Sequence, residues 1–301
     1  MGAIEFILSG VLAAATPFLL AALGELVVER SGVMNLGVEG IMALGAVCGF
    51  VIVYSGFGHL LGFAGAGVVG VLIALVFAVL ALEFRTNQVA AGLAIGIFGE
   101  GLSALIGAGY QSQTTTGLSE IAIPGLSTLP LIGGLFHQDI VVWLTIPLTI
   151  AIAYTLTKTR LGLVIRAVGE NPHAARAIGY PVIGIRYAAV AFGGLMAGFA
   201  GAYAATVYTP MWADGMIAGR GWIAIALVVF GTWMTGRVYA GALLFGALSL
   251  GELAAKSIGV RVPSEALAAT PYIVTILILG VISSNKLRMK RNSVASLGKP
   301  F

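Results

Sequence analysis

Several polar side chains that could contact a solute lie inside long apolar runs of this sequence. Glu100 stands about thirteen residues into one such run. A carboxylate in an apolar run is costly to bury unless it is paired or hydrated. Two interpretations stay open. Either Glu100 hydrogen-bonds the hydroxyl groups of a solute in a water-filled cavity, or it makes a structural hydrogen bond between helices.

Polar residues also stand at the starts of two apolar runs. Asn35 and Glu39 flank glycines at the start of one run. Asn87 and Gln88 stand at the start of another. Glycine-interrupted helices expose backbone dipoles to a polar ligand, so we place Asn35 and Glu39 in a candidate solute pathway. We place Asn87 and Gln88 at the cytoplasmic exit of that pathway. The alternative is that Asn35 and Asn87 only cap helices.

Two aromatic residues complete the candidate pathway. The flat faces of Phe98 and Trp222 suit stacking on a base or a sugar ring. The alternative is that both rings pack in the protein or anchor it at an interface.

Residues that build catalytic or metal centres do not cluster in this sequence. His59, His137 and His173 are far apart, and Cys48 is the single cysteine. No pair has metal-ligand spacing, and no nucleophile with a base can be assigned. We therefore expect no enzymatic activity and no cofactor or metal bound by this chain.

The composition requires a membrane around these residues. The 301 residues are 59% hydrophobic and 9% charged, and the mean hydropathy is +1.02. Soluble domains carry about 25% charged residues. This excludes a soluble enzyme, a disordered protein and a nucleic-acid binder. The 43 glycines, several of them four residues apart, favour helices that pack backbone to backbone.

The apolar runs are long enough for helices that cross a bilayer, which need about 20 residues each. We predict an all-α polytopic membrane protein that forms a single domain over residues 1–301. It has about nine transmembrane helices, or eight to ten, at 3–27, 34–54, 60–82, 88–109, 138–157, 185–207, 221–235, 238–255 and 266–284. The stretch 111–136 is rich in proline and glycine and could include a re-entrant piece. We expect Glu25, Glu29 and Arg30 at an interface, where charges are cheap.

The basic residues predict the orientation. Of the 16 lysines and arginines, 13 fall on one side of these spans and 3 on the other. The positive-inside rule makes the first side cytoplasmic. We therefore expect a cytoplasmic loop at 158–185, a basic cytoplasmic tail at 285–301 and an N-terminus outside.

Two segments suggest a weak inverted repeat. Residues 40–47 resemble residues 221–228, and the two copies run in opposite directions across the membrane in this topology. Such repeats build transport pathways at the midplane. Chance likeness between glycine-rich apolar segments is the alternative.

The loop 158–185 contains a short helix with clear ends. Asn171 is a good N-cap, Pro172 suits the first helical position and Gly179 is a natural stop. The helix has about two turns, and its alanines leave it slim enough to enter a groove on another protein. An interfacial helix on anionic lipid is the alternative.

Three segments resemble one family. Residues 166–179, with sequence RAVGENPHAARAIG, are similar to the cytoplasmic loop of permease subunits in bacterial ABC importers for sugars, nucleosides and branched-chain amino acids. Residues 29–40, ERSGVMNLGVEG, resemble the early signature of the nucleoside and simple-sugar branch, and residues 218–231, AGRGWIAIALVVFG, its late one. The chain is most like the smaller nucleoside-type permease.

The resemblance implies a type II ABC importer-like permease in a bacterial cytoplasmic membrane. Its implied partners are cytoplasmic ABC ATPase subunits, a second permease, more often in a heterodimer than a homodimer, and an external substrate-binding protein or lipoprotein. No Gly-x-x-x-x-Gly-Lys-Ser/Thr loop is present, so ATP and Mg belong on the partner ATPase. The implied ATPase-coupling residues are Gly169, Glu170, Asn171, Pro172, His173, Ala174, Ala175, Arg176 and Gly179.

The resemblance implies import of nucleosides by alternating access. A simple-sugar or branched-chain amino acid importer is the alternative within the family. A self-sufficient secondary transporter or channel, with a buried Glu100 that carries a proton, is the alternative from another class.

Overall fold

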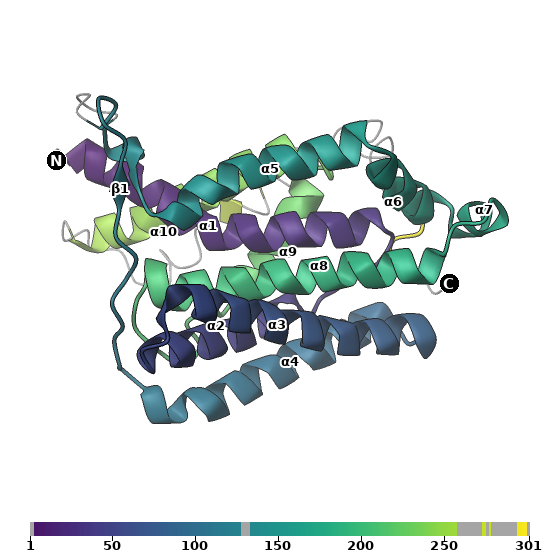
Figure 1. Cartoon of the computed structure of the whole chain (residues 1–301), viewed down its shortest axis with the longest axis horizontal. Helices are drawn as coiled ribbons and strands as arrows, with labels where there is room; N and C mark the ends of the chain where they lie inside the picture. Colours follow the sequence, from purple (N-terminus) through teal and green to yellow (C-terminus); the bar gives the residue numbers. More distant parts are fainter. Residues whose placement is uncertain (1–2, 128–132, 258–272, 275–276, 278–293, 300–301) are drawn as a thin grey trace.

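The computed structural model describes residues 3–127, 133–257, 273, 274, 277 and 294–299, and these are mostly helical (Figure 1). Two short strands, β1 (Ile121–Ala122) and β2 (His137–Gln138), pair antiparallel. The predicted all-α polytopic membrane fold is confirmed. The helices are α1 (Ala3–Arg30), α2 (Val38–Tyr54), α3 (Gly58–Ala78), α4 (Gln88–Gly107), α5 (Ile140–Lys158), α6 (Arg160–Glu170), α7 (Pro172–Ala177), α8 (Val182–Tyr203), α9 (Arg220–Phe230) and α10 (Thr235–Ser257).

Most of the predicted spans have a matching helix. Among the described residues, five helical segments are long and apolar enough to cross a membrane: Ser9–Arg30, Gly58–Glu83, Gln88–Tyr110, Ile140–Lys158 and Val182–Tyr208. α10 covers the predicted span 238–255, and α2 and α9 are shorter apolar helices. The predicted ninth span, 266–284, lies outside the described residues except at three positions, so the total of nine stays a prediction.

The two ends of the bundle differ in charge and in structure. α1, α3 and α5 finish, and α4, α8 and α10 begin, at the end where α6 and α7 lie (Figure 1). We call this the basic end, because it carries Arg30, Arg85, Lys158, Arg160, Arg166, Arg176, Arg186 and Arg237. At the opposite end, the described residues of 111–136 form extended chain, β1 and a 3-10 turn rather than a re-entrant helix. α6 was also missed in the predicted loop 158–185.

Glycines bring the central helices into backbone contact. A Cβ atom on Gly194 of α8 would collide with the backbone of Gly70 on α3. A Cβ on Gly198 would likewise collide with the Ala66 carbonyl. A Cβ on Gly45 of α2 would also collide with the backbone of Gly198. The predicted backbone-to-backbone packing is therefore confirmed for α2, α3 and α8.

The N-termini of α2 and α9 meet inside the bundle. A Cβ on Gly221 at the start of α9 would touch the backbone of Glu39 at the start of α2. From this point α2 runs to Tyr54, whose hydroxyl donates to Gln113 at the end away from α7. α9 runs toward Trp233, whose carbonyl accepts from Arg30 at the basic end. An inverted repeat would give this arrangement of two opposed helices.

Candidate functional site

Glu39 of α2 caps α9 from a different helix. Its Oε1 accepts a hydrogen bond of 2.6 Å from the Gly219 amide, and its Oε2 one of 3.2 Å from the Trp222 amide. Gly219, the N-cap residue, has φ +82° and no side chain to supply a cap. A carboxylate at a helix N-terminus satisfies free amides and favours the positive end of the helix dipole. Glu39 thus fixes the junction where the two helices meet.

Glu100 lies beside Glu39 on the crossing helix α4. Helices α2 and α4 approach so closely that a Cβ on Gly99 would collide with the Gly40 backbone. This brings the Glu39 and Glu100 carboxyl groups within hydrogen-bonding reach of each other. Unlike Glu39, Glu100 is exposed in the described structure. Its own chain therefore leaves the Glu100 side chain uncovered, and contact of Glu100 with a solute stays a prediction.

Glu100 lines a pocket of about 300 Å³ that combines a few polar groups with apolar walls. Ser103 of α4 and Asp214 of the loop before α9 line the same pocket, and Trp212 forms one of its walls. Two carboxylates and a hydroxyl give several hydrogen-bond acceptors in one small space. Hydroxyl groups of a sugar are suitable donors for such a pocket. Its volume lies at the lower end of the range for small-molecule sites, about 300–1,000 Å³.

The polar residues predicted at helix starts have structural partners. Asn87 caps α4 by accepting hydrogen bonds from the Val89 and Ala90 amides. Asn35 is buried and does not cap α2, whose N-cap is Gly37. Its side chain instead accepts from the Gly37 amide in the turn before the helix.

Gln88 is buried at the basic end. Its Oε1 accepts from the Met34 amide at 2.9 Å, and its Nε2 donates to the Lys299 carbonyl at 3.3 Å. These contacts join the start of α4 to two other segments. Neither Gln88 nor Asn87 lines the pocket of Glu100.

The two predicted aromatic residues are not part of that pocket. Phe98 and Trp222 are 53% and 41% exposed, and neither lines the pocket of Glu100. The ring in the pocket wall is Trp212, which is almost fully buried and packs against Phe50. Stacking of a solute on Phe98 or Trp222 stays a prediction.

The carboxylates of α1 are buried inside the chain, rather than placed at an interface as predicted. Glu25 and Glu29 are 2% and 1% exposed. Glu25 Oε1 accepts from the Asn35 amide at 3.1 Å, and Glu29 Oε2 accepts from the Trp233 indole at 2.6 Å. Their spacing of four residues places both on one helix face. That spacing was the available signal for a shared buried environment.

The second candidate site is α7, which projects beyond the bundle at the basic end (Figure 1). Asn171 caps the helix by accepting from the Ala174 amide at 3.0 Å, and Pro172 occupies its first position. Gly179 has φ +94°, the left-handed conformation that ends helices. The predicted boundaries of this short helix are therefore confirmed.

The two faces of α7 differ in exposure. Ala175 is 2% exposed and packs against Val168 of α6 and Val182 of α8. Ala175 is therefore covered by its own chain, and docking of α7 in a partner's groove stays a prediction. The outward face carries Ala174 and ends at Ile178, which is 72% exposed. Of the other predicted coupling residues, Glu170, His173 and Arg176 are exposed, and Gly169 is buried.

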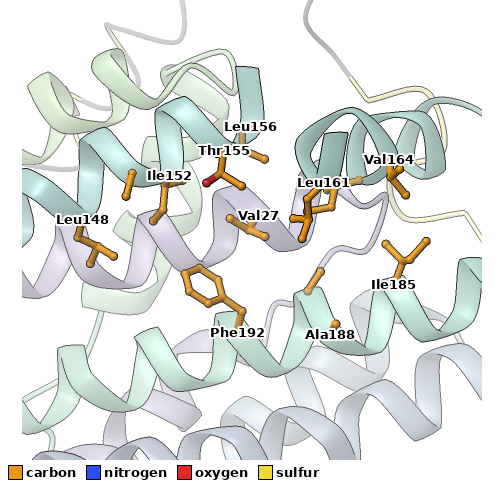
Figure 2. A pocket seen from close by; sticks show the side chains of 13 residues that line it. Val27, Leu148, Ile152, Thr155, Leu156, Leu161, Val164, Ile185, Ala188 and Phe192 are labelled. Carbon is orange, nitrogen blue, oxygen red and sulfur yellow. The ribbon is translucent and has the colours of Figure 1, made fainter. Parts of the chain in front are cut away.

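An apolar cavity of about 460 Å³ lies between α5, α6 and α8 (Figure 2). Leu148 and Ile152 of α5 face Phe192 of α8 across it, and Leu161 and Val164 of α6 line one end. Almost all of its surface is hydrocarbon. It offers a hydrophilic solute no set of hydrogen-bonding groups, in contrast to the pocket of Glu100.

Comparisons with known proteins agree with this architecture. Residues 7–282 match the family described as branched-chain amino acid transport system, permease component. A putative glucose ABC transporter permease of Haloferax volcanii is 37% identical over 94% of each chain. A guanosine ABC transporter permease of Bacillus subtilis is 35% identical, covering 92% of this chain and 91% of its own. A nucleoside ABC transporter permease of Lactococcus lactis is 30% identical over 97% and 96%.

The match to the family extends from α1 to beyond α10, and the three relatives are each covered over at least nine-tenths of their length. Five helical segments of the described residues have the length and apolar composition of membrane-spanning helices, as expected of a multi-pass membrane protein. This chain therefore belongs to the branched-chain amino acid transport system permease family, in which its relatives are sugar and nucleoside ABC transporter permeases.

Proposed function

We propose that this chain is the membrane subunit of an ATP-driven importer that moves nucleosides by alternating access. The observation that carries the proposal is α7, a capped helix that projects beyond the bundle and ends in the exposed Ile178. A motor protein can bind such a helix and, by moving it, displace the helices of the bundle. The guanosine and nucleoside permeases among the relatives support the choice of substrate.

The partners follow from this role. Cytoplasmic ABC ATPases bind α7 and carry the ATP and Mg, a second permease forms a heterodimer with this chain, and an external binding protein delivers the substrate. In this arrangement the basic end faces the cytoplasm of a bacterial cell. Binding to α7 combines the apolar Ile178 with the surrounding positive charge of Arg166 and Arg176.

We place the substrate pathway at the pocket of Glu100. Asp214 and Ser103 share this pocket with Glu100. The two carboxylates accept hydrogen bonds from ribose hydroxyls, and the Ser103 hydroxyl either accepts or donates one. Glu39 stabilises the region next to this pocket, because it accepts hydrogen bonds from two amides at the start of α9. A tolerant polar pathway is sufficient, because the external binding protein supplies most of the selectivity.

Co-purification tests the motor. The complex is isolated gently from its native membrane with wild-type chain, Ile178→Glu or Ile121→Glu. A charge in an apolar contact is costly, so Ile178→Glu loses the ATPase. Ile121 is 46% exposed at the opposite end, and Ile121→Glu retains the ATPase. If no ATPase accompanies the wild-type chain under conditions that preserve known complexes, the self-sufficient transporter becomes the better explanation.

Uptake measurements test the substrate. Cells that carry the complete transporter accumulate labelled guanosine, and unlabelled nucleosides compete with this uptake. Glucose is the second candidate, because a putative glucose permease is 37% identical to this chain. Uptake of glucose that nucleosides do not inhibit, or uptake of a branched-chain amino acid, would contradict the nucleoside assignment and leave the motor assignment in place.

A further inference from the structure

Residues 294–299, which we call the strap, are packed into the basic end of the bundle. Val294 and Ser296 are buried there. The Ser296 amide and hydroxyl both donate to the carbonyl of Gly169, at 3.1 and 2.6 Å. Gly169 is near the end of α6, just before α7. The strap is therefore hydrogen-bonded to the segment that leads directly into α7.

The same serine also contacts the turn between α1 and α2. Arg186 of α8 is buried and donates to the Ser296 hydroxyl at 3.3 Å and to the Ser31 carbonyl at 3.2 Å. Gly32 has φ +88°, and a Cβ there would collide with the Ser296 hydroxyl. Ser296 is thus enclosed between the end of α6, Arg186 and this turn.

A second anchor joins the strap to the same turn. The Lys299 carbonyl accepts from Gln88 Nε2, and the Oε1 atom of Gln88 accepts from the Met34 amide. The packing leaves little spare room. A Cβ on Gly169 would collide with the Arg30 carbonyl and reach Val294 at 3.0 Å.

The turn held by the strap leads to the helix junction in the bundle. Asn35 follows Met34 and donates its amide to Glu25. Four residues later, Glu39 holds the N-terminus of α9. A continuous series of contacts therefore runs from α6 through Ser296 to the turn, and from the turn to Glu39. Coupling between distant sites travels through such networks when both sites bias one element.

We propose that the strap transmits movement of α7 to the turn at residues 31–37, and so to the junction of α2 and α9. This role rests on the proposed function, since it requires an ATPase that moves α7. Ser296 and Arg186 are positioning residues in this proposal. They do not contact the substrate or ATP.

Hydrogen–deuterium exchange on the chain alone, in lipid nanodiscs, tests whether the strap is docked. Peptides that contain residues 294–299 are protected in the wild type. Ser296→Ala removes the hydroxyl contacts with Gly169 and Arg186, and exchange of the strap rises about tenfold, the effect of losing a hydrogen bond to a charged group. Ala295 is exposed, and Ala295→Ser leaves exchange unchanged. Wild-type exchange as fast as that of a free peptide would overturn the proposal.

Transport by the complete complex tests the transmission. The ratio of substrate moved to ATP hydrolysed falls about fivefold in Ser296→Ala, the lower end of typical coupling between sites, while the ATPase stays bound and active. Ala295→Ser keeps the wild-type ratio. An unchanged ratio in a variant whose strap exchanges freely shows a purely structural strap and refutes the proposal.

A second variant tests the strap if Ser296→Ala fails to fold. Gln88→Glu keeps the acceptor for the Met34 amide and removes the donor to Lys299, so it loosens only the second anchor. The same fall in ratio is expected. A docked strap in a chain that never binds an ATPase would refute the proposed function, whereas a bound ATPase with an undocked strap would refute only the strap.

Discussion

At the residue scale, Glu39 and Glu100 are neighbours with different surroundings. Glu39 is buried and bonded to two amides of α9, whereas Glu100 is exposed and lines a pocket. The first arrangement stabilises a helix junction, and the second leaves a carboxylate available to a solute. Adjacent carboxylates thus provide a matched pair of mutations that separates folding from transport.

We expect Glu39→Ala to destabilise the protein and Glu100→Gln to slow transport. Glu39→Ala leaves the Gly219 and Trp222 amides without their acceptor, which costs about 1–2 kcal/mol for a lost cap. Glu100→Gln removes a charge from the pocket and no cap. Thermal denaturation of the purified chain measures the first effect, and uptake by the assembled transporter measures the second. Normal uptake by Glu100→Gln, at wild-type abundance, would remove Glu100 from the pathway.

At the scale of elements, α7 depends on its cap because it has only six residues. Asn171→Ala removes the acceptor for the Ala174 amide and costs about 1 kcal/mol of helix stability. We expect weaker binding of the ATPase, measured by titration of the isolated ATPase against the chain in nanodiscs. Asn87 caps α4 in the same way, so Asn87→Ala is the matched control. Equal losses of affinity in both variants would contradict a docking role for α7.

Local signals explain which elements could be predicted. Asn171, Pro172 and Gly179 act within a few residues of one another, so the boundaries of α7 followed from the sequence. The inward direction of Ala175 depends on Val168 and Val182, and no local pattern shows that packing. α6 was not predicted although Thr159 caps it, because residues 158–185 were expected to form a loop around one short helix.

The candidate site was only partly predictable for the same reason. Glu100 was found as a polar residue inside an apolar run, and Glu39 as a polar residue beside glycines at the start of such a run; both are signals along the chain. Glu39 binds Gly219, which is 180 residues away in sequence. Asp214 and Trp212 of the pocket lie in a loop whose amides donate hydrogen bonds to Gln111 and Gln113, about 100 residues earlier in the chain. Pairings of this kind are set by the folded bundle and need the structure.

At the scale of the whole molecule, close glycine contacts hold the central helices together. Gly198 of α8 faces the backbone of α3, whereas Gly236 of α10 has open space where a Cβ would stand. We expect Gly198→Leu to prevent folding, because overpacking a tight contact costs about 1–3 kcal/mol or more. Gly236→Ala is expected to fold normally. Size-exclusion chromatography in detergent compares them, and a folded Gly198→Leu would show that α3 and α8 tolerate separation.

The orientation of the molecule links the charge of the basic end to its proposed motor. Lysine and arginine near span ends are retained on the cytoplasmic side, so α7 and the strap are expected inside the cell and residues 111–127 outside. Cys48 is the sole cysteine, and Cys48→Ala provides a background for single cysteines at exposed positions. A membrane-impermeant maleimide applied to intact cells is expected to label Ser119→Cys at once. Ala177→Cys, on α7, is expected to react only after permeabilisation.

The labelling pattern has consequences beyond topology. ATP is available only in the cytoplasm, so an ATPase can reach α7 only if the basic end lies there. Labelling of Ala177→Cys in intact cells would therefore exclude α7 as the motor's docking site, whatever the affinity measured with purified parts. It would also reverse the orientation of the bundle, so that the end opposite α7 would face the cytoplasm and not the external binding protein. In the expected orientation the basic end faces the ATPase in the cytoplasm, and the opposite end faces the external binding protein. One orientation therefore allows both the binding of the motor and the delivery of substrate, because these need opposite ends of the same bundle.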